Sequence, residues 1–316
     1  MNQKIQTKKK MSLYHLRDSM INLHVHTMYS LQDSVIKPND LAILLKKYKQ
    51  DACAITDHGS ISGWYDFNKA CLDQNIKPIF GNEYYCVDSY NDDNKTRRDH
   101  LVLLAMNQEG LHNIRTLQKI SVEHFYYRPI LSYEVLKEHT SGIYCTSACS
   151  LSSISKNILN NNFKEAEQYA EFFDEIFDGN FSLELQFHPN YADQDIINNS
   201  LVQIADGYGI SLSVSSDAHF LDENQRYLRR AIQAISWHKS FEDVDESLKS
   251  NCLGNDDLIL KFAEETSFDL DIVKKALHQT ERISQKCNAQ LEGAYPKIPV
   301  FNKHDKLDEL FEQVRW

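Results

Sequence analysis

Short apolar segments alternate with amphipathic ones up to about residue 220, and this alternation restricts the fold more than any other feature. Seven segments are rich in β-branched or aromatic residues, which is typical of buried strands: residues 20–25, 52–56, 77–80, 100–105, 142–147, 181–186 and 210–215. Between them, residues 40–49, 163–176 and 195–208 carry apolar side chains at helical spacing. The alternation predicts a parallel sheet covered by helices, and seven units favour a closed TIM-like barrel over an open sheet.

The strand pattern stops after about residue 222, and the remainder is predicted to be helical. Helical spacing indicates helices at residues 224–238, 256–265 and 269–287, followed by the turn-prone sequence YPKIP. The last residues begin another helix, whose apolar face (Leu307, Leu310, Phe311, Val314) needs a partner on this chain or on another. The predicted organisation is a basic tail at 1–19, a barrel at 20–222, a helical extension at 223–301, and a C-terminal helix at 302–316 as a candidate docking segment.

The composition is that of an ordinary globular protein, with 42% hydrophobic and 25% charged residues. No apolar run approaches the roughly 20 residues that cross a bilayer, and the basic start MNQKIQTKKK leads into no apolar signal segment. The seven cysteines include no CxxC pair, which favours a reducing environment. We therefore expect a cytoplasmic protein without a membrane partner. The net charge of −11 argues against non-specific coating of DNA, but it suits an enzyme whose carboxylates bind cations.

Polar side chains of the types that ligate metals stand at the ends of the predicted strands. His24 and His26 end the first strand, and Asp217 and His219 follow the last; in each pair the residues i and i+2 of an extended segment point the same way. The others are Asp57 and His58 after the second strand, Glu83 after the third, His100 at the start of the fourth and Cys149 after the fifth. Each signal alone could be structural. Because the carboxyl ends of barrel strands gather at one face, the joint pattern predicts a metal site.

The segments around these residues resemble the PHP (polymerase and histidinol phosphatase) domain, in the form found at the N-terminus of bacterial DNA polymerase III alpha subunits. The matching segments include INLHVHTMYSLQDSVIKPNDL, ACAITDHGSISGWYDFNKAC, IKPIFGNEYYC, YCTSACSLSS and SVSSDAHFL. The resemblance extends from about residue 20 to about residue 301, and these motifs are highly specific to the family.

The resemblance implies nine metal ligands: His24, His26, Asp33, His58, Glu83, His100, Cys149, Asp217 and His219. Asp33 stands where many free-standing members have histidine, and Cys149 stands where the family has histidine or cysteine. The family pattern assigns the nine residues to three metals: His24, His26, Glu83 and Asp217 to the first, Glu83, His100 and Cys149 to the second, and Asp33, His58 and His219 to the third. Many polymerase members have lost several of these residues, whereas this sequence retains all nine, which favours activity.

Two or three bound Zn, Mn or Fe ions would lower the pKa of a bound water and stabilise charge on a leaving oxygen. We therefore expect His58 and Glu83 to be essential for catalysis. Asp57 is expected to orient His58 in a carboxylate–histidine pair, although it could equally cap a turn. Cys149 could be a catalytic thiolate, but a soft metal ligand is the preferred interpretation, because metal-bound cysteines are already deprotonated.

Residues that contact a substrate carry weaker signals, because exposed arginines are common and tyrosines are often buried. The candidates are Arg97, Arg98 and Arg128 for phosphate groups, Tyr126 and Tyr127 for stacking on bases, and His188 for the pocket itself.

Three functions compete. The polymerase-type motifs favour a DNA phosphodiesterase, most simply a 3′–5′ exonuclease acting on single-stranded DNA or 3′ ends. The chain length and acidic charge are compatible with a phosphatase for small phosphomonoesters. The apolar C-terminal helix supports a non-catalytic PHP subunit that assists a separate DNA polymerase chain. The chain itself is not expected to polymerise DNA, because the resemblance ends before the polymerase palm, and Asp269 and Asp271 read as the start of a helix.

Overall fold

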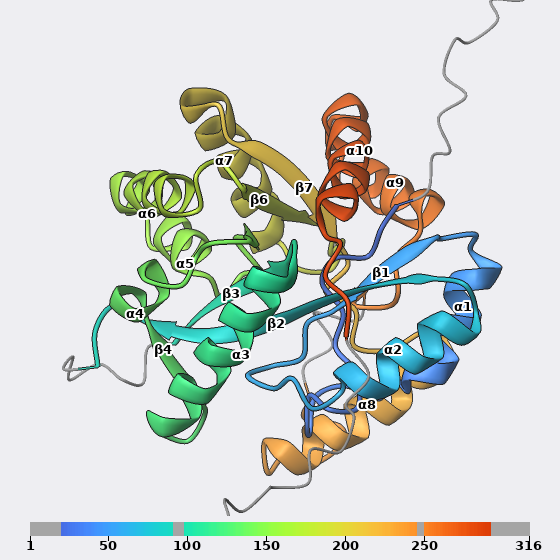
Figure 1. The fold of residues 1–316 in the computed structure, drawn as a ribbon. Helices are drawn as coiled ribbons and strands as arrows, with labels where there is room; N and C mark the ends of the chain where they lie inside the picture. The colour runs from blue at the N-terminus through green and yellow to red at the C-terminus, as the bar shows by residue number, and fades with distance from the viewer. Residues whose placement is uncertain (1–19, 91–97, 245–249, 292–316) are drawn as a thin grey trace, which may run out of the picture.

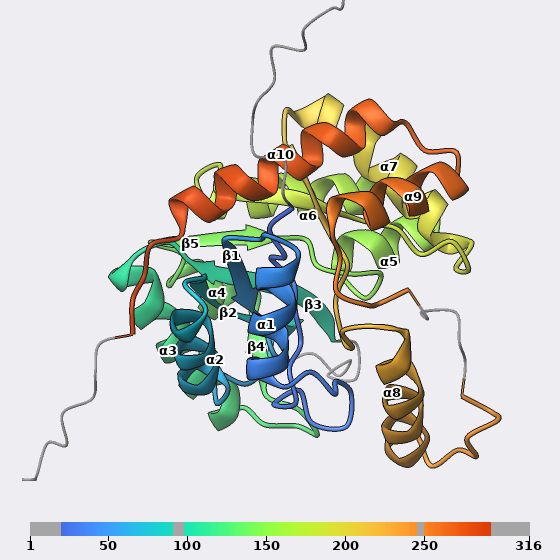
Figure 2. The same ribbon diagram turned by 90° about the vertical axis from the view of Figure 1, so that its right-hand side faces the viewer.

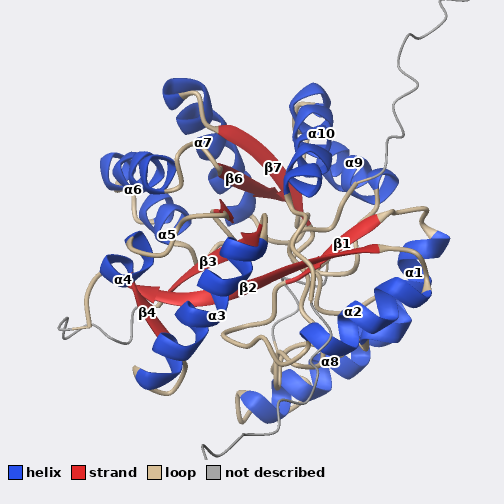
Figure 3. Cartoon of the chain, viewed as in Figure 1, coloured by secondary structure: helices blue, strands red, loops and turns tan. Residues whose placement is uncertain are grey.

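The computed structural model describes residues 20–90, 98–244 and 250–291. Figures 1 and 3 show a curved sheet with helices around it. The strands are β1 (Ala52–Ile55), β2 (Lys77–Val87), β3 (Asp99–Ala105), β4 (Ile130–Ser132), β5 (Ile143–Thr146), β6 (Phe181–Gln186) and β7 (Ser211–Ser215). They lie in the order β1-β2-β3-β5-β6-β7, and β4 pairs with β2.

The described helices follow the strands in the alternation that the sequence predicts. They are α1 (Pro38–Lys47), α2 (Trp64–Asp73), α3 (Gln108–Glu123), α4 (Tyr133–Lys137), α5 (Ser153–Leu159), α6 (Phe163–Ile176), α7 (Asp193–Tyr208), α8 (Glu223–Ser236), α9 (Asp256–Glu265) and α10 (Leu270–Lys286). Among these described segments, none is both long and apolar enough to cross a membrane. Helices α8–α10 fall within the predicted extension, whereas the tail at 1–19 and the helix at 302–316 lie outside the described residues.

The sheet is parallel except at β3, which runs antiparallel to both β2 and β5. The prediction of an entirely parallel sheet is therefore wrong at this strand. An antiparallel pair needs no helical crossover, and β3 is the next described element of the chain after β2. The reversal brings the first residues of β3 to the edge where its neighbours end, since Asp99 of β3 pairs with Cys86 near the end of β2.

The segment at 20–25, predicted as the first strand, forms only isolated bridges. Asn22 bridges Cys53 of β1, and Val25 bridges Ala218 after β7. Several amides of the segment donate to side chains instead of backbone carbonyls: Met20 to Asp256, Ile21 to Thr280 and Val25 to Thr56. The segment nevertheless lies between the two edge strands of the sheet and joins them. This closure completes the predicted α/β barrel.

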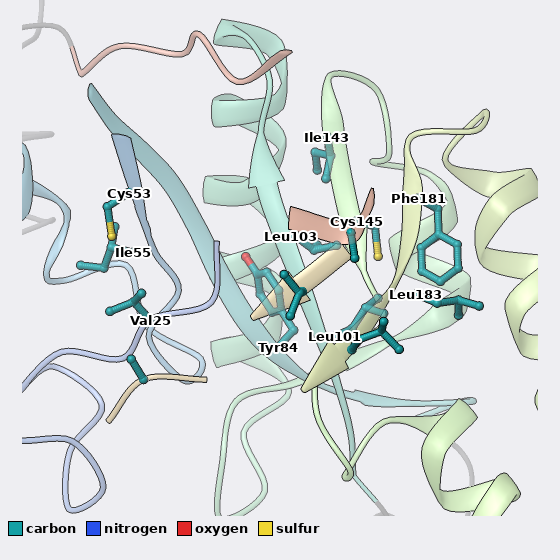
Figure 4. Close-up of a cluster of buried hydrophobic side chains, with 14 of the residues drawn as sticks. Val25, Cys53, Ile55, Tyr84, Leu101, Leu103, Ile143, Cys145, Phe181 and Leu183 are labelled. Carbon is teal, nitrogen blue, oxygen red and sulfur yellow. The ribbon is translucent and has the colours of Figure 1, made fainter. Parts of the chain in front are cut away.

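The two faces of the sheet differ in chemistry. One face packs its apolar side chains under the surrounding helices, as Figure 4 shows for Ile55, Leu103 and Leu183 among others. The other face carries a smaller apolar cluster that includes Ala52, Ala54, Ile79, Val102 and Leu104. Helix α10 adds Ile283 and Cys287 to this second cluster and lies across that end of the barrel (Figure 2).

Toward the carboxyl ends of the strands, the second face becomes polar. Glu83 of β2, Thr146 of β5, Glu184 of β6 and Ser215 of β7 are all buried there. Strand β6 shows the alternation clearly, because Phe181, Leu183 and Leu185 join the apolar core while Ser182, Glu184 and Gln186 do not. A buried polar site therefore occupies this end of the barrel.

Candidate metal centre

The nine residues predicted as metal ligands all lie at this polar end, and each contacts at least one of the others. His24, His26 and Asp33 come from the segment before α1, His58 follows β1, Glu83 lies in β2, His100 starts β3, Cys149 follows β5, and Asp217 and His219 follow β7. The reversed direction of β3 explains why His100 reaches the cluster from the start of its strand.

Glu83 lies at the middle of the cluster. Its Oε1 is 3.0 Å from Nδ1 of His100 and 3.3 Å from Nε2 of His24. Its Oε2 is 2.7 Å from Nδ1 of His58 and 3.2 Å from Nε2 of His26. A single carboxylate thus faces four imidazoles.

Asp217 and Asp33 extend the cluster on one side of Glu83. Asp217 Oδ1 is 3.3 Å from Nε2 of His24 and 3.2 Å from Nε2 of His26. Asp33 Oδ2 is 3.2 Å from Nε2 of both His58 and His219.

Cys149 extends the cluster on another side, with its Sγ 3.5 Å from Nδ1 of His100 and 3.9 Å from Oε1 of Glu83. Burial, with the nearby Glu83 carboxylate, holds the pKa of the Cys149 thiol well above its ordinary value. Without a cation beside it, this thiol stays protonated, which argues against an independent thiolate nucleophile.

Arg229 of α8 is a buried partner of the cluster that the sequence did not suggest. Its Nη2 lies 3.4 Å from Asp33 Oδ1, and its Nε donates to the Asp33 carbonyl oxygen at 3.4 Å. Helix α8, which stands apart from the other helices in Figure 2, thereby contacts the candidate centre.

Three buried atoms of the cluster make no hydrogen bond of good geometry among the described residues: Asp217 Oδ1, and the pair His58 Nδ1 and Glu83 Oε2, which face each other at 2.7 Å. A buried polar atom without a partner costs free energy, and a bound cation would satisfy all three. The ligand atoms of three overlapping groups lie within 4.8 Å of one another: His26, His58 and His219; His24, His26 and Glu83; and His58, Glu83 and His100. Imidazole, carboxylate and thiol donors suit Zn, Mn or Fe. The residues present therefore fit a metal centre.

The electrostatics of the carboxylates agree with this fit. Burial alone would raise the pKa of Glu83, but His100 and His58 outweigh it and hold the pKa well below its usual range. The same competition, with His24 as the largest opposing charge, lowers the pKa of Asp217. Both carboxylates are therefore ionised at neutral pH, as metal ligands must be.

The imidazoles divide into two kinds. Burial alone would lower the pKa of His58, but the acidic neighbours, chiefly Glu83, raise it well above its ordinary value. Burial and the nearby Arg229 instead lower the pKa of His219 to about 4. In the absence of a cation, His58 balances carboxylate charge as an imidazolium, whereas His219 is already neutral.

Glu184 is a buried partner of the cluster that no sequence motif marked. Its Oε1 accepts a hydrogen bond from Nδ1 of His24 at 2.8 Å, and Thr146, Gln186 and Ser215 donate to the same carboxylate. Burial would raise the pKa of Glu184, but the His24 charge lowers it, so the carboxylate is ionised. The signal was present in FSLELQ, where a glutamate stands on the polar side of a buried strand.

Asp57 does not pair with the ring of His58, so that prediction is wrong. Its Oδ1 accepts from Thr27 N at 2.6 Å and from Ser30 Oγ at 2.7 Å, and its Oδ2 accepts from Thr27 Oγ1 at 2.8 Å. The sequence Asp57-His58 suggested a local pair, but the chain folds Asp57 onto the loop that follows His26. Asp57 therefore acts on the cluster through Ser30.

Ser30 links Asp57 to His26 and fixes the protonation of its ring. Because a carboxylate can only accept, the Ser30 hydroxyl donates its hydrogen to Asp57. Ser30 Oγ, 3.0 Å from His26 Nδ1, must then accept from that ring nitrogen. His26 therefore carries a proton on Nδ1, and Nε2 is the nitrogen that faces the cluster.

The predicted substrate contacts divide between the rim of the site and the interior. Arg98 donates to the carbonyl oxygen of the exposed Tyr126 at 2.8 Å, and Arg128 is exposed nearby. His188 is buried, with Nδ1 2.7 Å from Ser250 Oγ and Nε2 3.2 Å from Gln186 Oε1, so both of its ring nitrogens have protein partners. Arg97 lies outside the described residues.

The fold and this cluster define an α/β barrel whose polar end has the donor chemistry of a divalent-metal site. The model of the PHP domain matches residues 22–188, more than half of the chain, and the chain therefore belongs to the PHP domain family.

Its relatives include DNA polymerase III alpha subunits. The subunit from Borreliella burgdorferi is 34% identical over 278 residues, which cover 86% of this chain and 24% of the relative. The subunit from Aquifex aeolicus is 33% identical over 235 residues, covering 71% of this chain and 20% of the relative. The chain thus spans about a quarter of the length of these relatives. Among solved structures, one described as a metal-dependent phosphoesterase from Bifidobacterium adolescentis has a TM-score of 0.41 and 13% identity, covering 63% of this chain and 87% of that one.

Proposed function

We propose that this chain is a metal-dependent phosphoesterase that cleaves phosphodiester bonds in DNA, as a 3′–5′ exonuclease. The observation that carries the proposal is the convergence of histidine, carboxylate and cysteine side chains at one buried end of the barrel, where the Glu83 carboxylate faces four imidazoles. Membership of the PHP family supports a phosphoesterase, and relatives that are DNA polymerase subunits support DNA as the substrate.

Bound divalent metals would supply an activated water and positive charge for the phosphoryl oxygens. The residues of this chain would hold them with the nine ligands His24, His26, Asp33, His58, Glu83, His100, Cys149, Asp217 and His219. Glu83 would bridge, since it faces four imidazoles, and Cys149 would be a soft ligand.

Three histidines are oriented by partners at Nδ1 so that Nε2 is the nitrogen available for ligation. His24 donates from Nδ1 to Glu184, and His219 Nδ1 lies 2.7 Å from the Asp217 carbonyl oxygen, an atom that can only accept. With the Ser30 contact at His26, each of these rings keeps a proton on Nδ1 and turns Nε2 toward the cluster, where Nε2 would ligate a metal without a proton. The side chains that orient these rings, rather than any protein nucleophile, are therefore this chain's contribution to the chemistry.

The proposal is tested by metal content and nucleotide release. Purified chain should contain two or three divalent metals, and with Mn²⁺ or Zn²⁺ it should release nucleotides from the 3′ end of labelled single-stranded DNA. Glu83→Gln and His58→Ala should abolish release, because both remove atoms at the centre of the cluster. His112→Ala, on the exposed side of α3, is the matched control and should retain full activity.

The outcome separates the competing functions. Phosphate release from small monoesters without nucleotide release would make the chain a phosphomonoesterase. If the chain contains no metal, shows neither activity and still binds a separate DNA polymerase, it is a non-catalytic subunit. The hydrolase proposal then falls.

A further inference from the structure

We propose that an exposed aromatic turn beside the candidate metal centre binds an unpaired nucleobase of single-stranded DNA. The turn consists of Tyr126, Tyr127 and Arg128, with Tyr85 and Arg98 in contact with it. This inference rests on the proposed function, since it identifies what holds the DNA strand next to the cleaved phosphodiester.

The backbone ties the aromatic turn to the centre. Tyr126 N donates to the Arg128 carbonyl oxygen at 3.0 Å, and the chain then enters β4, where Ile130 pairs with Tyr85 of β2. On the other side, Pro129 packs against Gly59, the residue after His58: a Cβ on Gly59 would lie 3.2 Å from Pro129 Cγ. Gly59 has a positive φ of 53°, so a side chain there would be strained as well as crowded. The turn is thus held one residue away from a candidate ligand.

A stack of planar groups leads from the turn into the cluster. The Arg128 guanidinium lies 5.8 Å from the centre of the Tyr85 ring. The Tyr85 ring in turn stacks on His58, with centroids 5.5 Å apart and planes at 22°, and meets His100 edge-on at 5.1 Å. A base that joins this stack from outside would place its adjoining phosphate near His58.

The tyrosine rings of the turn are presented to solvent rather than to the core. Tyr126 is 43% exposed and Tyr127 is 76% exposed, and their rings meet nearly perpendicular at 4.8 Å. Tyr127 also adopts a positive φ of 59°, which is unfavourable for a bulky side chain. Folding alone gains nothing from exposing two rings on a strained backbone, and such features gather at binding sites.

Two arginines give the turn the charge that a nucleic-acid strand requires. Arg98 donates to the Tyr126 carbonyl oxygen at 2.8 Å, and its guanidinium lies 5.9 Å from the Tyr126 ring. Arg98 Nε is buried and has no hydrogen-bond partner within the described residues. Aromatic rings that stack on bases, flanked by arginines for phosphate, are the usual means of binding single strands without sequence preference. On a chain of net charge −11, this local pair of cations stands out.

The test measures binding of the full chain to a labelled oligothymidine strand by fluorescence anisotropy, with a chelator present so that no cleavage occurs. A strand of equal length made of abasic residues is the second ligand. Stacking on one base contributes enough that Tyr126→Ala or Tyr127→Ala should weaken oligothymidine binding by about 5- to 100-fold. Neither variant should alter binding of the abasic strand. Tyr126→Phe and Tyr127→Phe should retain binding, because the ring remains.

Tyr208→Ala is the matched control. Tyr208 is 42% exposed and ends α7, which leads into the start of β7 at the opposite end of the sheet, so this variant should bind like the unaltered chain. The inference is overturned if the alanine variants bind oligothymidine normally, if they lose the abasic strand equally, or if the unaltered chain does not bind oligothymidine. If the alanine variants lose oligothymidine binding but the unaltered chain never cleaves DNA, the inference stands and the exonuclease proposal falls. If the unaltered chain cleaves DNA but the alanine variants bind oligothymidine normally, the exonuclease proposal stands and the inference falls.

Discussion

At the scale of single residues, neighbouring groups fix which ring nitrogen of a histidine carries a proton. Glu184, the Asp217 carbonyl and the Asp57–Ser30 pair each hold a proton on Nδ1 of a different imidazole. Imidazole ligands depend on such partners for both orientation and basicity. The sequence motifs identify the histidines, whereas groups that orient their rings, such as Glu184 and Asp57, come from distant segments of the chain.

Replacing Glu184 with glutamine tests this control. The amide cannot bear the charge that faces His24, and its NH₂ group would compete with the donors from Thr146 and Ser215. We expect metal affinity to fall by about 10- to 100-fold while the fold is retained. Titration with a competing chelator, followed by metal analysis, measures the change. Glu165→Gln, exposed on α6, is the control, and equal metal retention in the two variants would contradict the role given to Glu184.

Strand-end positions indicate eight of the nine clustered side chains, the family resemblance adds Asp33, and neither identifies the groups that support them. His24-Val25-His26 and Asp217-Ala218-His219 stand out because their spacing is local. Glu184 and Ser30 do not, because their importance depends on which loop or strand folds beside them. Asp57 was assigned to its sequence neighbour His58, although its partners lie about 30 residues earlier, at Thr27 and Ser30.

At the scale of elements, the sequence predicts the boundaries of helices more accurately than the directions of strands. The predicted ranges of α6 and α9 agree with the structure at both ends, because amphipathic spacing and polar flanking residues are read within one segment. Strand β4, with three residues, is too short to show a period and was not predicted. The reversal of β3 depends on pairing between strands, which the periodicity of a single strand does not encode.

Helix α3 offers a test of how closely these elements pack. A Cβ on Gly110, in its first turn, would lie 1.8 Å from the carbonyl oxygen of Gly142, just before β5. Gly110→Ala should therefore lower the free energy of unfolding by about 1–3 kcal/mol, measured by urea denaturation. Gly207→Ala in α7 meets no atom within 4 Å and should instead leave stability unchanged or raise it by up to about 1 kcal/mol. Similar values for the two variants would contradict this packing.

At the scale of the whole molecule, acid should destabilise the metal-free protein partly through His188. Burial lowers its pKa to about 4, from an ordinary value near 6.5. Between these values the unfolded chain binds a proton at this site and the folded chain does not, so stability is complete above pH 6.5 and falls as the pH decreases toward 4.

The His188→Gln variant isolates this contribution. From pH 7 to pH 5, the unaltered chain should lose about 2 kcal/mol more unfolding free energy than the variant. Urea denaturation with a chelator present measures both, and parallel pH profiles would contradict the assignment. The test compares how the unfolding free energy of each chain changes with pH. A loss of stability that the substitution causes equally at every pH does not affect this comparison.

The closure of the barrel by residues 20–26 has a consequence for the order of events during synthesis. The first two candidate ligands, His24 and His26, leave the ribosome early, but their partners Asp217 and His219 follow nearly two hundred residues later. Such distant pairings form late, because closing a long loop costs entropy before any contact repays it. A growing chain therefore lacks Asp217 and His219 until late, and the nine candidate ligands gather only once both ends of the sheet have met. Metal binding by the complete set of ligands would then indicate that the barrel has closed.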